Sequence, residues 1–393
     1  MPGSRIDNEK GTTRRLLFAG AAAATAAGAA AVAAETGLLG NPPQTGASAP
    51  PQRHGGESTE AGATPSASGQ VYVTSDGSDR NSGESWGSAL ATIGRALEVV
   101  GNGTVYVGAG TFDGGFTIGR AAVRGSGRDS TFIQATNDTH TIITMTDGAL
   151  LSDLNVQGGP RFTGTAILIT GTLVHVQDVD VKNDDKTDPK AGYGGYGVVL
   201  RDGEGCLFTR VETSRLRLAW KVGGANHVFV QMRGDSNYRD ILFGGESSTD
   251  ADTFLKSGAH LILGSKFVQG GNIGVPGAAT VRSIEIAGNG QHTLIDCDWD
   301  ETDSAEWLVS SDNNVLTRCA VAPRNTLNLT GDFNTVQALK ILGDVRVTGS
   351  NNSLWNTFAQ TGGSLTVNGS DNLVQGESGV RAEGSGIRRL AFA

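Results

Sequence analysis

Hydrophobic residues between Leu151 and Leu373 follow one short motif that is repeated with variations. Each copy opens at a Gly or Asn turn. It continues with an apolar residue, two free positions, a second apolar residue, one free position and a third apolar residue. A recurring unit of about 20 residues or more that cannot bury its apolar side alone is typical of a solenoid. The first apolar position of the successive copies holds Leu151, Val176, Phe208, Phe229, Ile262, Leu294, Leu316, Val336, Leu354 and Leu373.

The segment ahead of the repeat predicts the entrance to the solenoid. A short strand at 71–73 is followed by a polar turn at 76–85. Ser88 is expected to cap an amphipathic helix over 89–100, and a strand at 104–107 follows. We expect this helix to cover the hydrophobic end of the first coil, because an uncapped solenoid end promotes aggregation.

This order of elements resembles the start of secreted right-handed parallel β-helix proteins of the pectate-lyase-like superfamily. There, a polar turn of the DGSD type precedes an amphipathic helix, and a TVYV-type strand begins the first coil. The resemblance covers roughly residues 70–385 and implies an all-β fold, a single-stranded right-handed parallel β-helix with a short N-terminal capping helix. It implies less about activity, since the superfamily includes lyases, hydrolases, epimerases and non-catalytic spikes. The matching residues are Asp76 to Asp79, Asn81, Gly83, Ala91 to Ile93, Ala96, Leu97 and Thr104 to Phe112.

Composition agrees with many strands and turns. The chain has 58 Gly, and Gly disfavours long helices because it costs about 1 kcal/mol relative to Ala in a helix interior. The formal charge of -9 argues against broad nucleic-acid binding, which needs a basic surface. The three cysteines form no zinc pattern and no disulfide framework.

The N-terminus resembles a twin-arginine export signal. Arg14 and Arg15 form the pair, and an Ala/Gly stretch runs to a small-residue cleavage point near Ala33 or Ala34. The alternative is an uncleaved membrane anchor, since the stretch is about the 20 residues needed to span. Alanine and glycine insert poorly, however, and the signal contains no cysteine for a lipid anchor.

We divide the chain into an export signal (1–34), a disordered linker (35–69) and one β-helix domain (70–393). The linker holds five of the 10 prolines among Gly, Ser, Thr and Ala, a composition that cannot bury a core. No later stretch is apolar enough to cross a membrane, so we expect a secreted or cell-surface protein without stable membrane insertion of the mature chain.

Stacked coils turn the positions between the apolar residues outward, because side chains alternate along a strand. The long copies also carry insertions at 182–196, 235–256 and 270–279, which we expect to wall a groove. One outward stripe comprises Asn155, Asp180, Glu212, Arg233, Lys266, Asp298, Ala320, Lys340 and Phe358. A second stripe comprises Asp153, Asp178, Arg210, Gln231, Gly264, Asp296 and Arg318.

These stripes contain the candidate catalytic residues. Carboxylates about 5 Å apart on neighbouring coils suit a retaining glycosidase, with one as nucleophile and one as acid. Neighbouring cations would stabilise charge and lower the pKa of one carboxylate. The alternative is a solvated ladder of alternating charge. The candidates are Asp178, Asp180 and Glu212 as acid, base or nucleophile, and Arg210, Arg233, Lys266 and Arg239 as charge stabilisers.

A uronate lyase or epimerase needs a base and a group that neutralises the substrate carboxylate. Tyr238, Arg239, Lys221 and the pair Arg215 and Arg217 are candidates. The arginine pattern of calcium-dependent pectate lyases and the DPH signature of alginate epimerases are both absent. Asp184-Asp185 resembles the pair of polygalacturonase-like hydrolases, but that family's HG and RIK motifs are missing, which favours a polar loop tip.

Other side chains suggest binding or structural roles. Sugar rings could stack on Tyr193, Tyr196, Trp220 and Tyr238. The acidic run with Asp296, Asp298 and Asp300, expected on one strand face, could hold Ca²⁺. Cys297 and Cys319 fall on adjacent coils, as a disulfide or as stacked buried thiols. His227 and His292 lie at turns and are expected to be structural.

Two functions fit these observations. The first is a polysaccharide-active enzyme, a lyase or glycoside hydrolase that works on an extracellular polysaccharide in a groove over the middle coils. The second is a non-catalytic, cell-surface carbohydrate-binding or adhesin-like module. The sides of β-helices can also pair, and a homotrimer is one arrangement that would complete a site across subunits.

Overall fold

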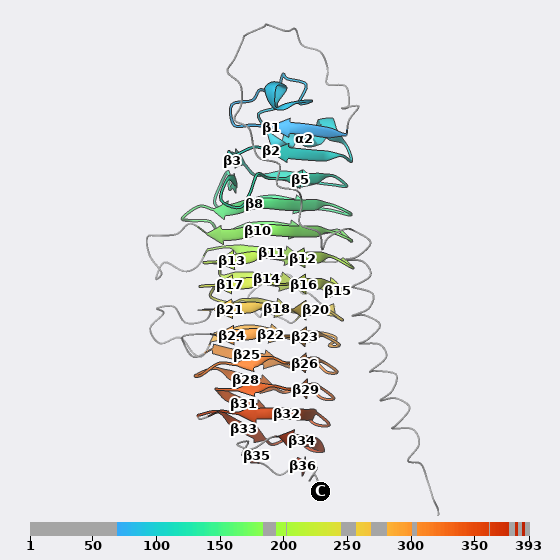
Figure 1. Cartoon of the computed structure of the whole chain (residues 1–393), viewed down its shortest axis with the longest axis vertical. Helices are drawn as coiled ribbons and strands as arrows, with labels where there is room; N and C mark the ends of the chain where they lie inside the picture. The colour runs from blue at the N-terminus through green and yellow to red at the C-terminus, as the bar shows by residue number, and fades with distance from the viewer. Residues whose placement is uncertain are drawn as a thin grey trace, which may run out of the picture. The chain divides into compact units, whose positions relative to one another are not determined.

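The computed structural model describes residues 69–183, 194–201, 203–244, 257–268, 281–300, 305–360, 362–376, 382–383 and 387–389. These residues form a right-handed parallel β-helix, whose coils stack from the end with α2 to the end with β36 (Figure 1). The expected fold class is confirmed. The export signal, the loop tip with Asp184, Asp185 and Tyr193, and the tail after Arg389 lie outside the described residues.

A larger sheet of 22 strands supplies two sides of each coil. Its strands are β1 (Gln70–Val73), β2 (Thr104–Val107), β3 (Gly110–Asp113), β5 (Ala122–Arg124), β6 (Thr131–Gln134), β8 (Leu150–Gly158), β10 (His175–Asn183), β12 (Leu207–Thr209), β13 (Glu212–Ser214), β16 (Val228–Val230), β17 (Arg233–Asp235), β20 (Leu261–Leu263), β21 (Lys266–Val268), β23 (Thr293–Ile295), β24 (Asp298–Asp300), β26 (Val315–Thr317), β27 (Ala320–Val321), β29 (Thr335–Gln337), β30 (Lys340–Ile341), β32 (Ser353–Ala359), β34 (Asn372–Gly376) and β36 (Ile387–Arg389).

A smaller sheet of 12 strands closes the third side. It contains β4 (Phe116–Ile118), β7 (Ile143–Met145), β9 (Thr165–Ile169), β11 (Tyr196–Leu200), β14 (Leu218–Val222), β18 (Ile241–Phe243), β22 (Val281–Ile286), β25 (Ala305–Val309), β28 (Thr326–Leu329), β31 (Asp344–Val347), β33 (Ser364–Val367) and β35 (Ala382–Glu383). The short strands β15 (Gly224–Ala225) and β19 (Ser257–Gly258) pair with each other.

The predicted apolar ladder is present with one correction. Strand register aligns its members coil by coil from Leu151 to Leu354, and their side chains are buried. The residue opposite Leu354 is Val374 rather than Leu373. The buried Asn372 takes the place that Asn352 has one coil earlier, which moves the apolar position by one residue. Earlier coils contribute Val71, Val105 and Val123.

A second ladder, made of polar side chains, lies at the corner two residues before each residue of the apolar ladder. Each buried side chain of this ladder accepts a hydrogen bond from the backbone N–H of the equivalent residue in the preceding coil. Neighbouring coils are therefore hydrogen-bonded to each other at the edge of the core. His227, His260 and His292 accept through Nδ1 at 3.2, 3.3 and 3.4 Å. The structural role expected for His227 and His292 is confirmed. Oδ1 atoms continue the ladder at Asn314, Asn334, Asn352 and Asn372.

The motif is not one continuous strand in the middle coils. The residue two positions after the first apolar residue is in the left-handed region, with φ of 52° at Asp178 and Arg210 and 54° at Asp296. From β12 to β30 this residue lies between two short strands, for example between β12 and β13, whereas Asp178 bends the continuous strand β10. Asp296 therefore does not share a strand face with Asp298, contrary to the expectation for a calcium site.

The N-terminal cap is confirmed, with a later start for its helix. Helix α2 spans Ile93–Val100 and buries Ile93, Ala96, Val99 and Val100 at the end of the stack (Figure 1). Thr92 caps it by accepting the N–H of Arg95 at 3.2 Å. Ser88 belongs instead to the separate 3-10 turn η1 (Trp86–Ser88). The Asp79 carboxylate accepts the N–H groups of Ala91 and Thr92, which holds the residues between the two helices extended.

The cysteines are free thiols in the core. Cys206, Cys297 and Cys319 are all buried. A hydrogen bond with Cys319, together with burial, raises the pKa of the Cys297 thiol well above its ordinary value. Cys297 and Cys319 are therefore stacked buried thiols and not the disulfide that was the other expectation. No helix among the described residues is long and apolar enough to cross a membrane.

Candidate functional site

Five charged side chains line the outer side of the larger sheet and form what we call the charge ladder. They are borne by β10, β13, β17, β21 and β24, and strand register places each one beside the next, as the repeat predicted. Inward neighbours such as Val179 and Val181 are fully buried, so alternation directs the charges outward. The charge ladder consists of Asp180, Glu212, Arg233, Lys266 and Asp298.

Arg128 joins the two carboxylates at the head of the ladder. Its Nη1 atom lies 2.9 Å from Oδ1 of Asp180 and 3.9 Å from Oε2 of Glu212. The two oxygen atoms can be no farther apart than the sum of these distances. Sequence analysis missed Arg128 because it belongs to the turn between β5 and β6, ahead of the repeat, where no motif marks it.

The two carboxylates have different surroundings. Asp180 accepts a charge-assisted hydrogen bond from Arg128, and its side chain is 24% exposed. Glu212 is 35% exposed and has Arg233 Nε at 3.8 Å in addition to Arg128 at 3.9 Å. Both contacts of Glu212 exceed hydrogen-bond distance. Asp180 therefore accepts a direct hydrogen bond from a cation, whereas Glu212 has two cations nearby without a hydrogen bond to either.

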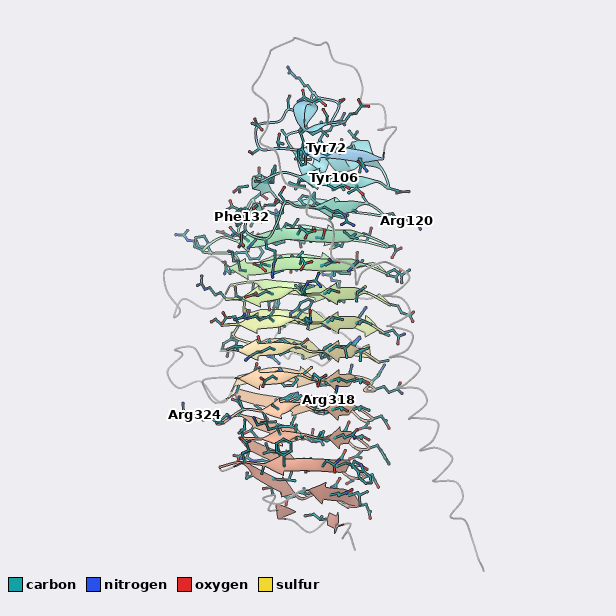
Figure 2. All side chains as sticks on the ribbon, in the orientation of Figure 1. Tyr72, Tyr106, Arg120, Phe132, Arg318 and Arg324 are labelled. Atoms are coloured by element: carbon teal, nitrogen blue, oxygen red, sulfur yellow. The ribbon has the colours of Figure 1, made fainter. Side chains whose placement is uncertain are left out.

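The rest of the ladder also places opposite charges side by side. Lys266 Nζ lies 3.9 Å from Oδ2 of Asp298, and both side chains are about half exposed. At the other end, Lys182 Nζ lies 6.0 Å from the ring centre of Phe132, which is labelled in Figure 2. Every ladder carboxylate thus has a cationic neighbour.

Asp178 and Arg210 lie at a corner beside the ladder, bound to each other. Arg210 donates from Nε and Nη2 to the two carboxylate oxygens, each at 2.6 Å. Asp296 and Arg318 make the same bidentate pair four coils farther on. Burial raises the pKa of the Asp178 carboxyl. The hydrogen bonds and positive charge of Arg210 outweigh burial and hold this pKa below its ordinary value.

These two corner pairs allow a matched stability test. Asp178→Asn is expected to lower the free energy of unfolding by about 1 kcal/mol at pH 7, a figure limited by solvent screening at the exposed Arg210. Asp296→Asn should cause a smaller loss, because its pair is more exposed, with fractions of 53% and 57% against 22% and 42%. Denaturant titration of both variants measures the difference.

The pH dependence provides the control for this test. Because the folded pKa of Asp178 is lowered, its contribution is present near neutral pH and disappears as the pH falls below about 4. The gap between wild type and Asp178→Asn should therefore narrow as the pH falls below about 4. Equal losses for both variants, or a gap independent of pH, would contradict this account.

Several predicted site residues lie elsewhere. Arg239 pairs with Glu285 of β22 at 2.8 Å, on the side of the smaller sheet. Trp220 is fully buried in the core, because the sequence of β14 alternates so that it points inward, and no sugar can stack on it. Tyr196 and Tyr238 are half-buried on the side of the smaller sheet. The ring of Tyr196 lies 6.0 Å from Nζ of Lys221.

The predicted calcium ligands are already engaged with cations. Arg318 occupies both oxygens of Asp296, and this lowers the pKa of that carboxyl. Lys266 faces Asp298. In the part of the chain that the structure describes, no group of three His, Cys, Asp or Glu side chains is placed to hold a metal. Calcium binding remains a prediction, and the ion would have to displace Arg318 and Lys266.

An aromatic cluster near the capped end was missed. Tyr72 and Tyr106 stack on the outer side of β1 and β2 with ring centres 5.5 Å apart, and both are labelled in Figure 2. Trp86 lies 4.8 Å from Tyr72 and is 49% exposed. The alternation of valine and tyrosine in both strands was the signal that could have placed these rings outside the core.

The chain is similar to several solved structures. No family model matches the chain, and no curated protein matches it either. The Azotobacter vinelandii mannuronan C-5 epimerase AlgE6 A-module is 16% identical, with a TM-score of 0.43 over 76% of this chain and 93% of that one. A mannuronic acid-specific polysaccharide family 6 lyase from human gut microbiota is 14% identical, with a TM-score of 0.44 over 73% and 74%.

A rhamnogalacturonan lyase is 15% identical, with a TM-score of 0.36 over 81% of this chain and 85% of that one. At such identities the similarity concerns the fold and not the site. The function has to be argued from the side chains of this chain itself.

Proposed function

We propose that this protein is an exported glycoside hydrolase that binds a polysaccharide across the outer side of β10, β13 and β17. Asp180 and Glu212 act as its pair of catalytic carboxylates. The observation that supports this proposal is the shared contact of Arg128 with both side chains, which brings the carboxylates together on neighbouring coils. The twin-arginine signal proposed at Arg14 and Arg15 would carry the enzyme to such a substrate.

The surroundings of the pair suggest their roles. Asp180, which is oriented by its hydrogen bond from Arg128, acts as the nucleophile. Glu212 protonates the leaving oxygen and then activates water, because its carboxylate makes no hydrogen bond to Arg128 or Arg233 that a substrate would have to displace. Arg233 and Lys266 continue the ladder beyond the pair and bind polar or acidic substituents of the glycan.

Hydrolysis fits this site better than elimination does. A lyase needs a base near the acidic carbon of a uronate. Of the bases suggested by the sequence, Lys221 is buried beside Tyr196, and Arg239 is paired with Glu285. Neither belongs to the charge ladder, whose two head residues are carboxylates.

A non-catalytic carbohydrate-binding module is the second candidate. It is favoured by one observation, that each carboxylate of the charge ladder has a cation within 4.0 Å. Such pairing stabilises a charged outer surface without requiring catalysis.

A panel of extracellular polysaccharides separates these functions. New reducing ends without absorbance at the unsaturated-uronate band are the expected result. Absorbance at that band would identify a lyase. Binding of a glycan without any product, lost in Arg233→Ala and Lys266→Ala variants, would identify the binding module and overturn the hydrolase proposal.

A further inference from the structure

One outer side of the larger sheet is aliphatic over five successive coils. The strands β12, β16, β20, β23 and β26 each turn their middle residue into the core and their two flanking residues outward. These outward positions are half-buried, apart from the buried Leu261. The aliphatic face consists of Leu207, Val228, Val230, Leu261, Leu263, Ile295 and Val315.

The rims of this face also carry unusual side chains. Three large hydrophobic side chains are exposed among the described residues, and two of them, Leu173 at 70% and Phe333 at 57%, lie on one rim. They occupy left-handed corner positions, where φ is 54° and 57°. The opposite rim is the corner column with the two Asp–Arg pairs. A broad apolar face with two exposed apolar side chains along one rim indicates a protein contact.

The charges on the second rim identify the partner. Over six successive coils this corner column reads Asp178, Arg210, Gln231, Gly264, Asp296 and Arg318. Reversing the order sets Asp178 opposite Arg318 and Arg210 opposite Asp296, with the uncharged Gln231 and Gly264 opposite each other at the centre. The charges of this column therefore complement the charges of a second copy of the column that runs in the opposite direction.

We propose that the aliphatic face binds a second copy of this chain in an antiparallel, two-fold symmetric dimer. A two-fold axis parallel to the strands reverses the order of the coils and keeps each column opposite itself. It places Val230 against Leu263 of the other copy at the centre. It also sets Phe333 opposite Gly148, which has no side chain to obstruct it.

A parallel arrangement lacks this complementarity. In it the charged column would face the other rim, which over the same coils holds Leu173, Gly205, Asn226, Ala259, Gln291 and Asn313, all uncharged. Counted from the coil of Gly148 to the coil of Phe333, the antiparallel contact spans roughly 34 Å by 17 Å, on the order of 600 Å² per copy, and the aliphatic face supplies its central five coils. Since a standard interface buries about 800 Å² per partner, we expect micromolar affinity rather than an obligate dimer. This proposal does not depend on the proposed function.

Sedimentation of the full chain between about 1 and 100 µM tests the dimer across the expected range of Kd. Wild type should change from monomer to dimer with concentration. Val230→Lys and Leu263→Glu should each weaken self-association at least tenfold, because each buries charges against apolar residues. Thr366→Lys on β33, in the smaller sheet, is the matched control and should leave the dimer unchanged.

Mixing the two variants tests the antiparallel arrangement. In a heterodimer, the lysine at 230 meets the glutamate at 263, and the second contact keeps the native valine and leucine. The equimolar mixture should therefore dimerise although neither variant does alone. Thr209→Lys and Ile295→Glu form a second couple with the same logic, in case either central variant fails to fold. A monomer at 100 µM, a trimer, a dimer insensitive to these changes, or a mixture that stays monomeric would overturn the proposal.

Discussion

Glu212→Gln is expected to lower the rate of glycoside hydrolysis by about a thousandfold, the typical contribution of a general acid. Asp180→Asn should cause at least as large a loss, because no covalent intermediate can form without the nucleophile. Both replacements are nearly isosteric and keep the outward positions on β13 and β10. Initial rates on the polysaccharide identified in the panel provide the measurement.

Asp298→Asn is the matched control for these two variants. Asp298 belongs to the same ladder and also faces a cation, Lys266, but lies beyond the carboxylate pair. It should retain most of the activity. An aryl glycoside with a good leaving group needs little protonation, so it should restore the first, bond-cleaving step in Glu212→Gln and not in Asp180→Asn. This step appears as an initial burst of the released aryl alcohol, because Glu212→Gln still lacks the base for the second step. Equal loss in all three variants would show a general effect of ladder charge and would contradict the assigned roles.

The protein is expected to lose stability sharply between pH 6.5 and pH 4 because of its imidazole ladder of His227, His260 and His292. The rings stack with centres 4.9 and 5.0 Å apart, and each Nδ1 accepts a backbone N–H, which requires the neutral form. Burial lowers the pKa of His227 and of His292 to about 4. Burial and the charges of its two stacked neighbours lower the pKa of His260 further.

The direction of the effect follows from proton binding. Above pH 6.5 the histidines are neutral in both states, and stability does not depend on them. Between pH 6.5 and 4 the unfolded chain binds protons that the folded chain refuses, so stability falls with pH. At pH 4.5 each histidine with a folded pKa of about 4 should contribute a loss of about 2 kcal/mol or more.

The chain itself supplies the control for this prediction. Asn314 occupies the same ladder position, accepts the N–H of His292 through Oδ1 and donates through Nδ2 to the carbonyl of Ser311. Replacing the three histidines by asparagine should therefore keep the ladder and remove its proton binding. Denaturant titrations at pH 7.5 and 4.5 should show a much smaller difference for this variant. An unchanged difference would contradict this role of the ladder and would assign the acid sensitivity to other groups, such as His175, whose pKa is lowered to about 4 by burial and by the charge of Arg124.

The apolar ladder could be predicted from the sequence because parallel coils stack in register, so a periodic core position becomes a column. The same logic placed Asp180 beside Glu212 and Glu212 beside Arg233. The shift at Val374 was missed because the residue that decides it, Asn372, is polar. Its hydrogen bond to the preceding coil takes precedence over the position of Leu373.

The corners could not be predicted because their residue types are mixed. Arg210 and Gln231 adopt the left-handed region that glycine, asparagine and aspartate populate more readily. The sequence analysis treated these corner residues as strand residues. It therefore predicted that Asp296 and Asp298 share one strand face, which is wrong. Arg128 was missed because its contact depends on the path of a turn outside the repeat. Trp220 was wrongly predicted to lie on the surface, because an aromatic residue next to Lys221 can face either side of a short strand.

The configuration of the first sugar released tests the central claim most directly. Arg128 contacts both Asp180 and Glu212, and these residues are register partners on adjacent strands, whose spacing of about 4.8 Å matches the separation of about 5 Å that is typical of retaining enzymes. Proton NMR of the reaction mixture during the first minutes resolves the two anomers before they interconvert. We predict that the product retains the configuration of the cleaved linkage. Release of the inverted anomer, or of an unsaturated uronate, would contradict the assignment of Asp180 as nucleophile and Glu212 as acid.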